Sequence, residues 1–251
     1  MTTVTTVTSQ KDFPQHIERL RKHIRIYSRL PHSNKILSGK VLEKVAADAV
    51  HGHASDDNSF IDVIKDTTGW QLKSTMQNTR HLVWGRVKLE DKYDRILRAC
   101  ESETTRDELG ADLLRICNEK ARSSMEKHGV DELRYMHVKF MEGNTVHVTE
   151  AVLSGPKLFN THDFLWEWQN HEENSGALVG YHAETGEEWF RWYGQNENHF
   201  HLTNEAAWLE DKAVRLNHYE FNIASSQKRL PLELFEVVVN SAAQELFRKA
   251  S

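Results

Sequence analysis

The sequence is poor in cysteine and proline, and it has no long apolar run. Its 251 residues include two cysteines and four prolines. Two cysteines cannot build a disulfide framework or a zinc site made of cysteine alone, so we expect a reducing location, the cytoplasm. No stretch approaches the roughly 18 apolar residues of a membrane span. The first residues lack the basic flank and apolar core of a secretory signal, so we expect no membrane partner.

Positive charge is scarce overall but unevenly distributed. The net charge of −5 excludes a uniformly basic nucleic-acid binder, although it does not exclude one basic face. Residues 16–40 hold seven Lys or Arg against one acid. Residues 161–220 hold twelve acids, three Lys or Arg, and five of the seven tryptophans. This contrast indicates two regions of different character, with a boundary near residues 153–156.

The chain is therefore divided into three parts. Residues 1–34 form a basic N-terminal helical segment, and residues 35–153 form the core that we expect to carry catalysis. Residues 154–251 form a Trp-rich part with hairpins and a C-terminal helix, suited to recognition or dimerisation and packed on the core as one domain.

Apolar periodicity predicts both helices and strands. Helical spacing marks residues 13–30, 40–50, 91–100, 105–127, 205–216 and 232–249. Extended or hairpin-like patterns mark residues 60–64, 70–75, 135–141, 146–153 and 176–201. Because helices and strands alternate along the chain, we expect a mixed α/β or α+β core.

Three polar side chains on the first predicted hairpin carry the strongest chemical signal. Gln71 and Lys73 are two residues apart, so both leave the same face of a strand, and a short turn brings Asp62 beside them. Asp62 and the amide oxygen of Gln71 are hard donors of the kind that Mg²⁺ prefers. Lys73 is suited to orient or deprotonate a water and to offset charge at phosphorus. Together they predict Mg²⁺-dependent hydrolysis of a phosphodiester.

The pattern Asp62-x8-Gln71-x-Lys73 resembles the signature of the PD-(D/E)XK nuclease superfamily, in the form with Gln in place of the second acid. The preceding helix with Glu43 is similar to the first core helix of that family, and the resemblance covers about residues 35–150. It implies a restriction-endonuclease-like α/β core, a central mixed sheet flanked by helices. It also implies Asp62 as main metal ligand, Gln71 as second ligand, Glu43 as accessory acid and metal ligand, and Lys73 as catalytic lysine.

The sequence departs from the family pattern in three places. Ile61, not proline, precedes Asp62. Gln71 removes one negative charge, which should weaken metal affinity. Little chain separates Glu43 from Asp62, so the sheet has little room for the usual first strand. Asp56 and Asp57 lie in the preceding loop and are alternative ligands.

The resemblance implies an endonuclease that acts on double-stranded DNA with Mg²⁺. A type II restriction enzyme is favoured because the chain lacks helicase and ATPase motifs and carries a large extra region. Cutting both strands needs two active sites, so we expect a homodimer.

Candidate DNA contacts fall in two places. The basic segment supplies side chains for the phosphate backbone, namely Arg21, Lys22, Arg25 and Lys35. The Trp-rich part supplies groups able to read base edges, namely Arg191, Gln195, Asn196, Asn198 and His199.

Three other interpretations remain open. The first is that the hairpin is purely structural, with Gln71 and Lys73 on a solvated face. The second is a non-catalytic nucleic-acid-binding protein on a nuclease-like scaffold. The third is a cupin-like metalloenzyme, because His199 and His201 alternate on a strand with Glu205 nearby, an arrangement that suits a transition metal.

Overall fold

The described part of the chain covers most of the predicted elements. The structure is a computed structural model that describes residues 5–8, 13–29, 37–55, 59–169, 176–194 and 198–223, with the backbone alone for residues 5–8. The helix predicted over residues 232–249 lies outside the described residues.

Seven strands form the larger sheet, in the order β1-β12-β7-β6-β4-β3-β2. They are β1 (Thr5–Thr8), β2 (His53–Ala54), β3 (Val63–Lys65), β4 (Thr68–Met76), β6 (Glu132–Phe140), β7 (Thr145–Leu153) and β12 (Ala213–Asn222). The sheet is mixed, because β1 with β12 and β4 with β6 are parallel pairs and the others are antiparallel. A short 3₁₀ turn, η1 (Glu142–Asn144), joins β6 to β7.

Five antiparallel strands form the smaller sheet, in the order β5-β11-β10-β9-β8. They are β5 (Leu82–Arg86), β8 (Phe164–Gln169), β9 (Ala177–His182), β10 (Glu188–Tyr193) and β11 (His199–Leu202). All four pairings are antiparallel.

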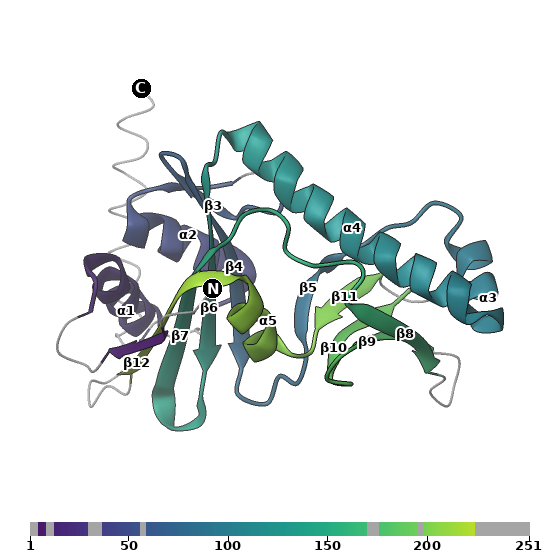
Figure 1. The fold of residues 1–251 in the computed structure, drawn as a ribbon. Helices are drawn as coiled ribbons and strands as arrows, with labels where there is room; N and C mark the ends of the chain where they lie inside the picture. The colour runs from purple at the N-terminus through teal and green to yellow at the C-terminus, as the bar shows by residue number, and fades with distance from the viewer. Residues whose placement is uncertain are drawn as a thin grey trace.

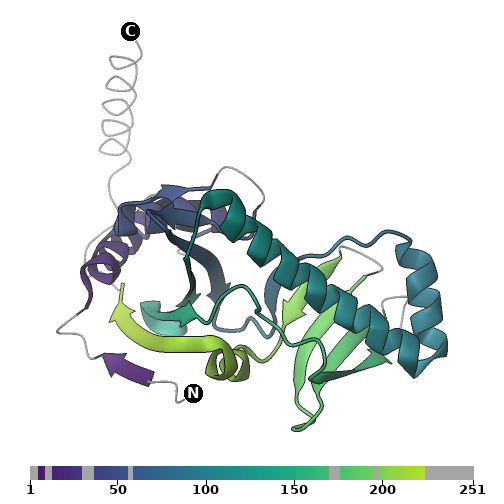
Figure 2. The same ribbon diagram turned by 45° about the horizontal axis from the view of Figure 1, so that its top comes forward.

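Helices flank the sheets. Helices α1 (Gln15–Tyr27) and α2 (Gly39–Val50) share an apolar core with one face of the larger sheet. Helix α4 (Glu103–His128) runs along both sheets, with α3 (Lys92–Glu101) at its far end and α5 (Glu205–Lys212) between the sheets (Figures 1 and 2). This arrangement confirms the predicted α/β class with a mixed central sheet flanked by helices.

The order of the strands along the chain does not follow the division into two sheets. β5 comes from the first half of the sequence but pairs in the smaller sheet, whereas β12 follows that sheet in sequence and pairs with β7 in the larger one. Side chains from both sheets share one apolar core, in which the ring of Trp84 lies 4.9 Å from Trp208 and 6.1 Å from Tyr135. The composition change near residue 153 therefore does not separate the two sheets.

One predicted helix is wrong over its second half. The helix expected over residues 205–216 ends at Lys212, and the chain continues directly as β12. Leu216, Tyr219 and Phe221 are buried there because the strand pairs along the whole of β7. Helical and extended elements meet without a Gly or Pro between them, so the boundary has no sequence signal.

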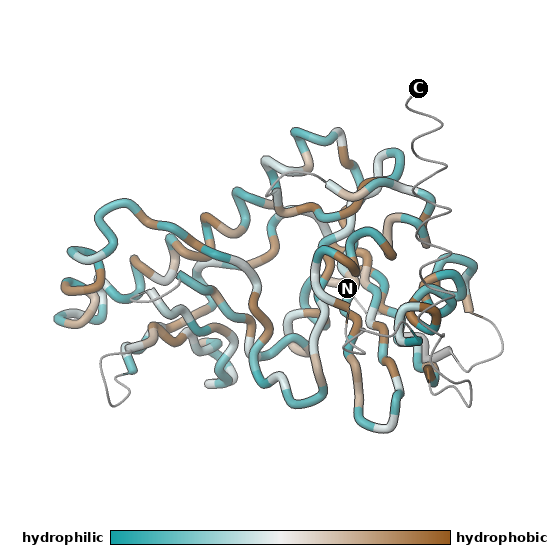
Figure 3. Tube along the Cα trace, turned by 180° about the vertical axis from the view of Figure 1, so that it is seen from behind, coloured by the Kyte–Doolittle hydropathy of each residue, from teal (hydrophilic) through white to brown (hydrophobic). Residues whose placement is uncertain are grey.

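The elements follow the expected separation of apolar and polar faces. Burial alternates along most of β7 and along β11, and Figure 3 shows hydrophobic and hydrophilic residues interspersed along the chain. In the part of the chain that the structure describes, no helix is both long and apolar enough to cross a membrane.

Gly110 gives a test of the packing between α4 and the smaller sheet. A Cβ at this position would overlap the indole ring of Trp166, which is buried and stacks on Phe190. We expect Gly110→Ala to lower the free energy of unfolding by about 1–3 kcal/mol, because overpacking outweighs the helix propensity of alanine. Urea unfolding measures this. Glu108→Ala, at an exposed position of the same helix, is the control, and equal effects of the two would refute the overlap.

Candidate active site

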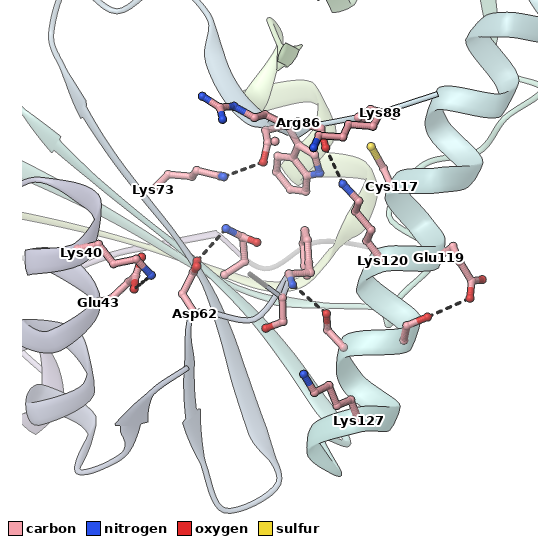
Figure 4. A pocket seen from close by; sticks show the side chains of 18 residues that line it. Lys40, Glu43, Asp62, Lys73, Arg86, Lys88, Cys117, Glu119, Lys120 and Lys127 are labelled. Carbon is pink, nitrogen blue, oxygen red and sulfur yellow. Dashed lines mark hydrogen bonds and ion pairs between the residues drawn. The ribbon is translucent and has the colours of Figure 1, made fainter. Parts of the chain in front are cut away.

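The four residues predicted to carry chemistry line a single cavity. It has a volume of about 860 Å³ and lies between α2, the β3–β4 hairpin, β5 and α4 (Figure 4). Glu43 comes from α2, Asp62 from the residue before β3, and Gln71 and Lys73 from β4. Side chains that are up to thirty residues apart are thus gathered at one place.

The hairpin places Asp62 by backbone pairing. Its amide donates to the carbonyl of Trp70 at 2.8 Å, and its carbonyl accepts from the amide of Ser55 at 2.8 Å. These bonds continue the antiparallel pairing one residue beyond β3. The carboxylate therefore lies beside Gln71 and Leu72, as the short predicted turn requires.

One oxygen of the Asp62 carboxylate is anchored. Oδ2 accepts from the amide of Leu72 at 2.7 Å and from Nε2 of Gln71 at 2.8 Å. Within the described residues, no hydrogen bond reaches Oδ1. The pKa of Asp62 is raised to about 6, mainly by burial and also by the charge of Glu43, while the Leu72 bond and the charge of Lys73 oppose the rise. Burial disfavours the ionised form of this carboxylate, and a cation bound beside it would favour that form.

Gln71 is oriented by the same contact. Its Nε2 donates to the carboxylate of Asp62 and, at 3.3 Å, to the carbonyl of Leu72. Since a carboxylate only accepts, the amide nitrogen must face Asp62. Among the described contacts none involves Oε1, which is therefore the end suited to bind a cation.

Lys73 is held by the smaller sheet. Its Nζ donates to the carbonyl of Trp84 at 2.8 Å and lies 5.5 Å from the ring centroid of that residue. Burial lowers the pKa of Lys73, while the charge of Asp62 raises it. Desolvation thus brings the amine closer to the neutral form that can accept a proton from water.

Glu43 occupies the α2 side of the cavity. Its Oε2 lies 2.8 Å from Nζ of Lys40, and its side chain is 13% exposed. Its charge raises the pKa of Asp62, so the two carboxylates share one electrostatic environment. This placement agrees with an accessory acid.

Further cations surround the cavity, and of these only Lys40 belongs to the basic segment of residues 16–40. They are Lys40, Arg86, Lys88, Lys120 and Lys127. With Lys73 they outnumber the lining acids, which are Glu43, Asp62 and Glu119. Lys120 donates to the carbonyl of Arg86 at 2.5 Å, which joins α4 to β5 at the edge of the cavity. The excess of positive charge suits a phosphate-bearing ligand.

The cavity offers few groups that could coordinate a cation, and these groups are chemically alike. No group of three His, Cys, Asp or Glu residues within the described ranges is gathered to hold a metal ion. Two carboxylates and one amide oxygen, from Glu43, Asp62 and Gln71, are all hard donors that fit Mg²⁺. The alternative ligands Asp56 and Asp57 lie outside the described residues.

The basic N-terminal candidates lie away from this cavity. Arg21 pairs with Glu18, and Arg25 donates to the carbonyl of Asn222 at 2.8 Å, while Lys22 is exposed. All are on α1 and none lines the cavity. Lys35 lies outside the described residues.

The predicted base-reading residues are only partly described. Arg191 pairs with Glu188 through two bonds of 3.0 and 2.7 Å, and Nε2 of His199 accepts from Nε of Arg86 at 3.3 Å. Asn198 precedes β11 with φ of 56°. Gln195 and Asn196 lie outside the described residues.

The cupin-like set is not assembled. Glu205 accepts from the hydroxyl of Tyr135 at 2.6 Å and contacts Nδ1 of His137 at 2.8 Å. The rings of His199 and His201, 6.0 Å apart, pack against other side chains. A transition-metal triad of these three residues therefore has no support in the geometry.

Comparisons with known proteins add nothing to this picture. A scan against protein-family models, a search of curated proteins and a search of solved structures each found no match. The case for the site rests on its own geometry and charge.

Proposed function

We propose that this chain is a Mg²⁺-dependent endonuclease of the PD-(D/E)XK type that hydrolyses phosphodiester bonds in DNA. The observation that carries the proposal is the convergence of Glu43, Asp62, Gln71 and Lys73 on one cavity with an excess of lining cations. A purely structural hairpin does not require a carboxylate and an amine that interact electrostatically in such a cavity.

Each side chain has a defined task in this proposal. Oδ1 of Asp62, Oε1 of Gln71 and the carboxylate of Glu43 are the groups that would hold Mg²⁺. Mg²⁺ held by these groups would lower the pKa of a coordinated water and offset charge on the leaving oxygen. Lys73 Nζ orients the attacking water and takes its proton, helped by the lowered pKa. Lys120 and Lys127, seven residues apart on one helical face, bind flanking phosphates.

The finer assignment follows the sequence. We propose a type II restriction endonuclease that cuts double-stranded DNA as a homodimer, since each chain offers one such cavity among its described residues. Cys100 and Cys117 are both free thiols, which agrees with the cytoplasm as the proposed location.

Incubation of the full chain with supercoiled plasmid tests the proposal. In Mg²⁺ we expect discrete linear fragments whose ends map to a fixed sequence, and in EDTA we expect none. Mapping the ends gives the recognition site and the cut position. Binding of DNA without any cleavage in Mg²⁺ or Mn²⁺ would refute the endonuclease.

A non-catalytic DNA-binding protein is the second candidate. It is favoured by one observation, the amide of Gln71 where the family pattern has an acid, which leaves Glu43 and Asp62 as the two carboxylates among the predicted metal ligands. In that case the lining cations bind the DNA backbone, and the affinity falls steeply with salt in the absence of Mg²⁺.

A further inference from the structure

The outward face of the smaller sheet carries a group of rings that the proposed mechanism does not use. We call this group, together with the neighbouring Arg86, the histidine patch. Its rings are those of His81, Tyr193, His199 and His201. The ring of His201 lies 5.1 Å from Tyr193, 6.0 Å from His199 and 6.1 Å from His81. The patch therefore lies over three adjacent strands, β5, β11 and β10.

The strand register turns these rings away from the core. Phe200 and Leu202 alternate with His199 and His201 on β11 and are buried in the apolar core. His199 pairs with Tyr193 on β10. His201 pairs on its other side with Val83, whose side chain is 43% exposed. The outward face at this end of the sheet is accordingly an open platform of partly exposed rings.

None of the five residues of the histidine patch is acidic. The pKa of His201 is lowered to about 4 by burial and by the neighbouring His81, His199 and Arg191, so its ring is neutral near pH 7. Glu188, the nearby acid, is already paired with Arg191. Nδ1 of His201 is buried and has no hydrogen-bond partner among the described residues. The cation of the patch is Arg86, whose side chain is exposed. An exposed guanidinium beside partly exposed rings suits a ligand that carries both bases and phosphates.

Arg86 connects the patch to the candidate active site. Its side chain lines the cavity, and its Nε donates to Nε2 of His199 at 3.3 Å. In Figure 4, Arg86 and Lys88 lie at the same edge of the cavity. Arg86 therefore links the cavity to the rings on β11 and β10.

We propose that the histidine patch binds an unpaired stretch of DNA next to the scissile phosphate. Bases stack on protein rings only when they are unpaired, whereas a duplex hides its base faces. A flat sheet face with rings and flanking Arg side chains is suited to this mode of binding. The inference rests on the proposed function for its ligand, and it adds that strand separation accompanies binding.

Fluorescence anisotropy in EDTA tests the patch without requiring cleavage. The probes are a labelled 20-nucleotide single strand and the duplex of the same sequence. We expect Tyr193→Leu to weaken binding of the single strand roughly 5- to 100-fold, the range for loss of one stacked base, and to change duplex binding less than about 2-fold. Tyr93→Leu, at an exposed position on α3, is the matched control and should change neither.

A second variant guards against a folding defect. His201→Leu keeps a side chain of similar size, and its thermal midpoint reports whether the sheet is intact. We expect it to show the same selective loss as Tyr193→Leu. The proposal that the patch binds unpaired DNA would be overturned by unchanged single-strand binding in both variants, or by equal losses for single strand and duplex. A failure of plasmid cleavage alone would instead refute the endonuclease and leave this result standing.

Discussion

Lys73→Met is expected to reduce Mg²⁺-dependent cleavage of DNA by about 10²- to 10⁴-fold, the range typical of losing a positioned acid or base. The methionine keeps the length and apolar stem of the side chain but removes the amine that faces the carbonyl of Trp84 and the charge of Asp62. The pKa of Lys73 is lowered by burial, so the wild-type amine is the group prepared to accept the proton of water. Single-turnover cleavage of plasmid DNA measures the rate.

The control for this variant is another lysine changed in the same way. Lys44 is exposed on α2 and does not line the cavity, so Lys44→Met should cleave at the wild-type rate. Removing a buried charge from Lys73 should leave the thermal midpoint within a few degrees, which separates lost chemistry from lost folding. Wild-type cleavage by Lys73→Met would exclude this residue as the base.

The hairpin part of the site was predictable because its geometry is local. The two-residue spacing of Gln71 and Lys73 fixes their common face whatever the rest of the fold does. A turn of two residues between β3 and β4 then leaves Asp62 only one place to lie, beside Leu72. Glu43 was reached through the helix that precedes the hairpin in the family pattern. For these residues, pairing in the sheet repeats what the sequence spacing already implies.

The remainder of the site depends on contacts that the sequence pattern does not predict. Trp84 supplies the carbonyl for Lys73, yet β5 is a five-residue strand whose partner β11 lies more than a hundred residues later. Its pairing is decided by long-range burial, not by local pattern. The seven-residue spacing of Lys120 and Lys127 shows that they share a helical face. It does not show that this face lies toward the hairpin.

This dependence has a structural consequence. The larger sheet carries Asp62, Gln71 and Lys73, but the amine is positioned by a strand of the smaller sheet. The cavity is therefore formed only when the two sheets pack on their shared core. Division of the chain by composition at residue 153 treats the Trp-rich part as an accessory, whereas β5, which lines the candidate cavity, pairs with β11 of that part.

Asp62→Asn should stabilise the metal-free protein while abolishing its response to Mg²⁺. The pKa of Asp62 is about 6, above its ordinary value of 3.8. The stability that it contributes is thus fully present below pH 3.8 and is lost as the pH rises through 6. Above pH 6 the ionised carboxylate lowers the free energy of unfolding by about 1–3 kcal/mol. Asparagine avoids this, because its one oxygen can accept both bonds now made to Oδ2.

Urea unfolding in EDTA at pH 5 and pH 8 separates the two contributions. The variant should exceed the wild type at pH 8 and approach it at pH 5, where the carboxyl of Asp62 is largely protonated. Mg²⁺ at millimolar concentration should then raise the thermal midpoint of the wild type at pH 8, since it binds the ionised folded form, and leave Asp62→Asn unchanged. A midpoint that rises equally in both proteins would place the cation elsewhere. A variant less stable than the wild type at pH 8 would mean that the hydrogen bonds to Oδ2 outweigh the cost of the buried charge.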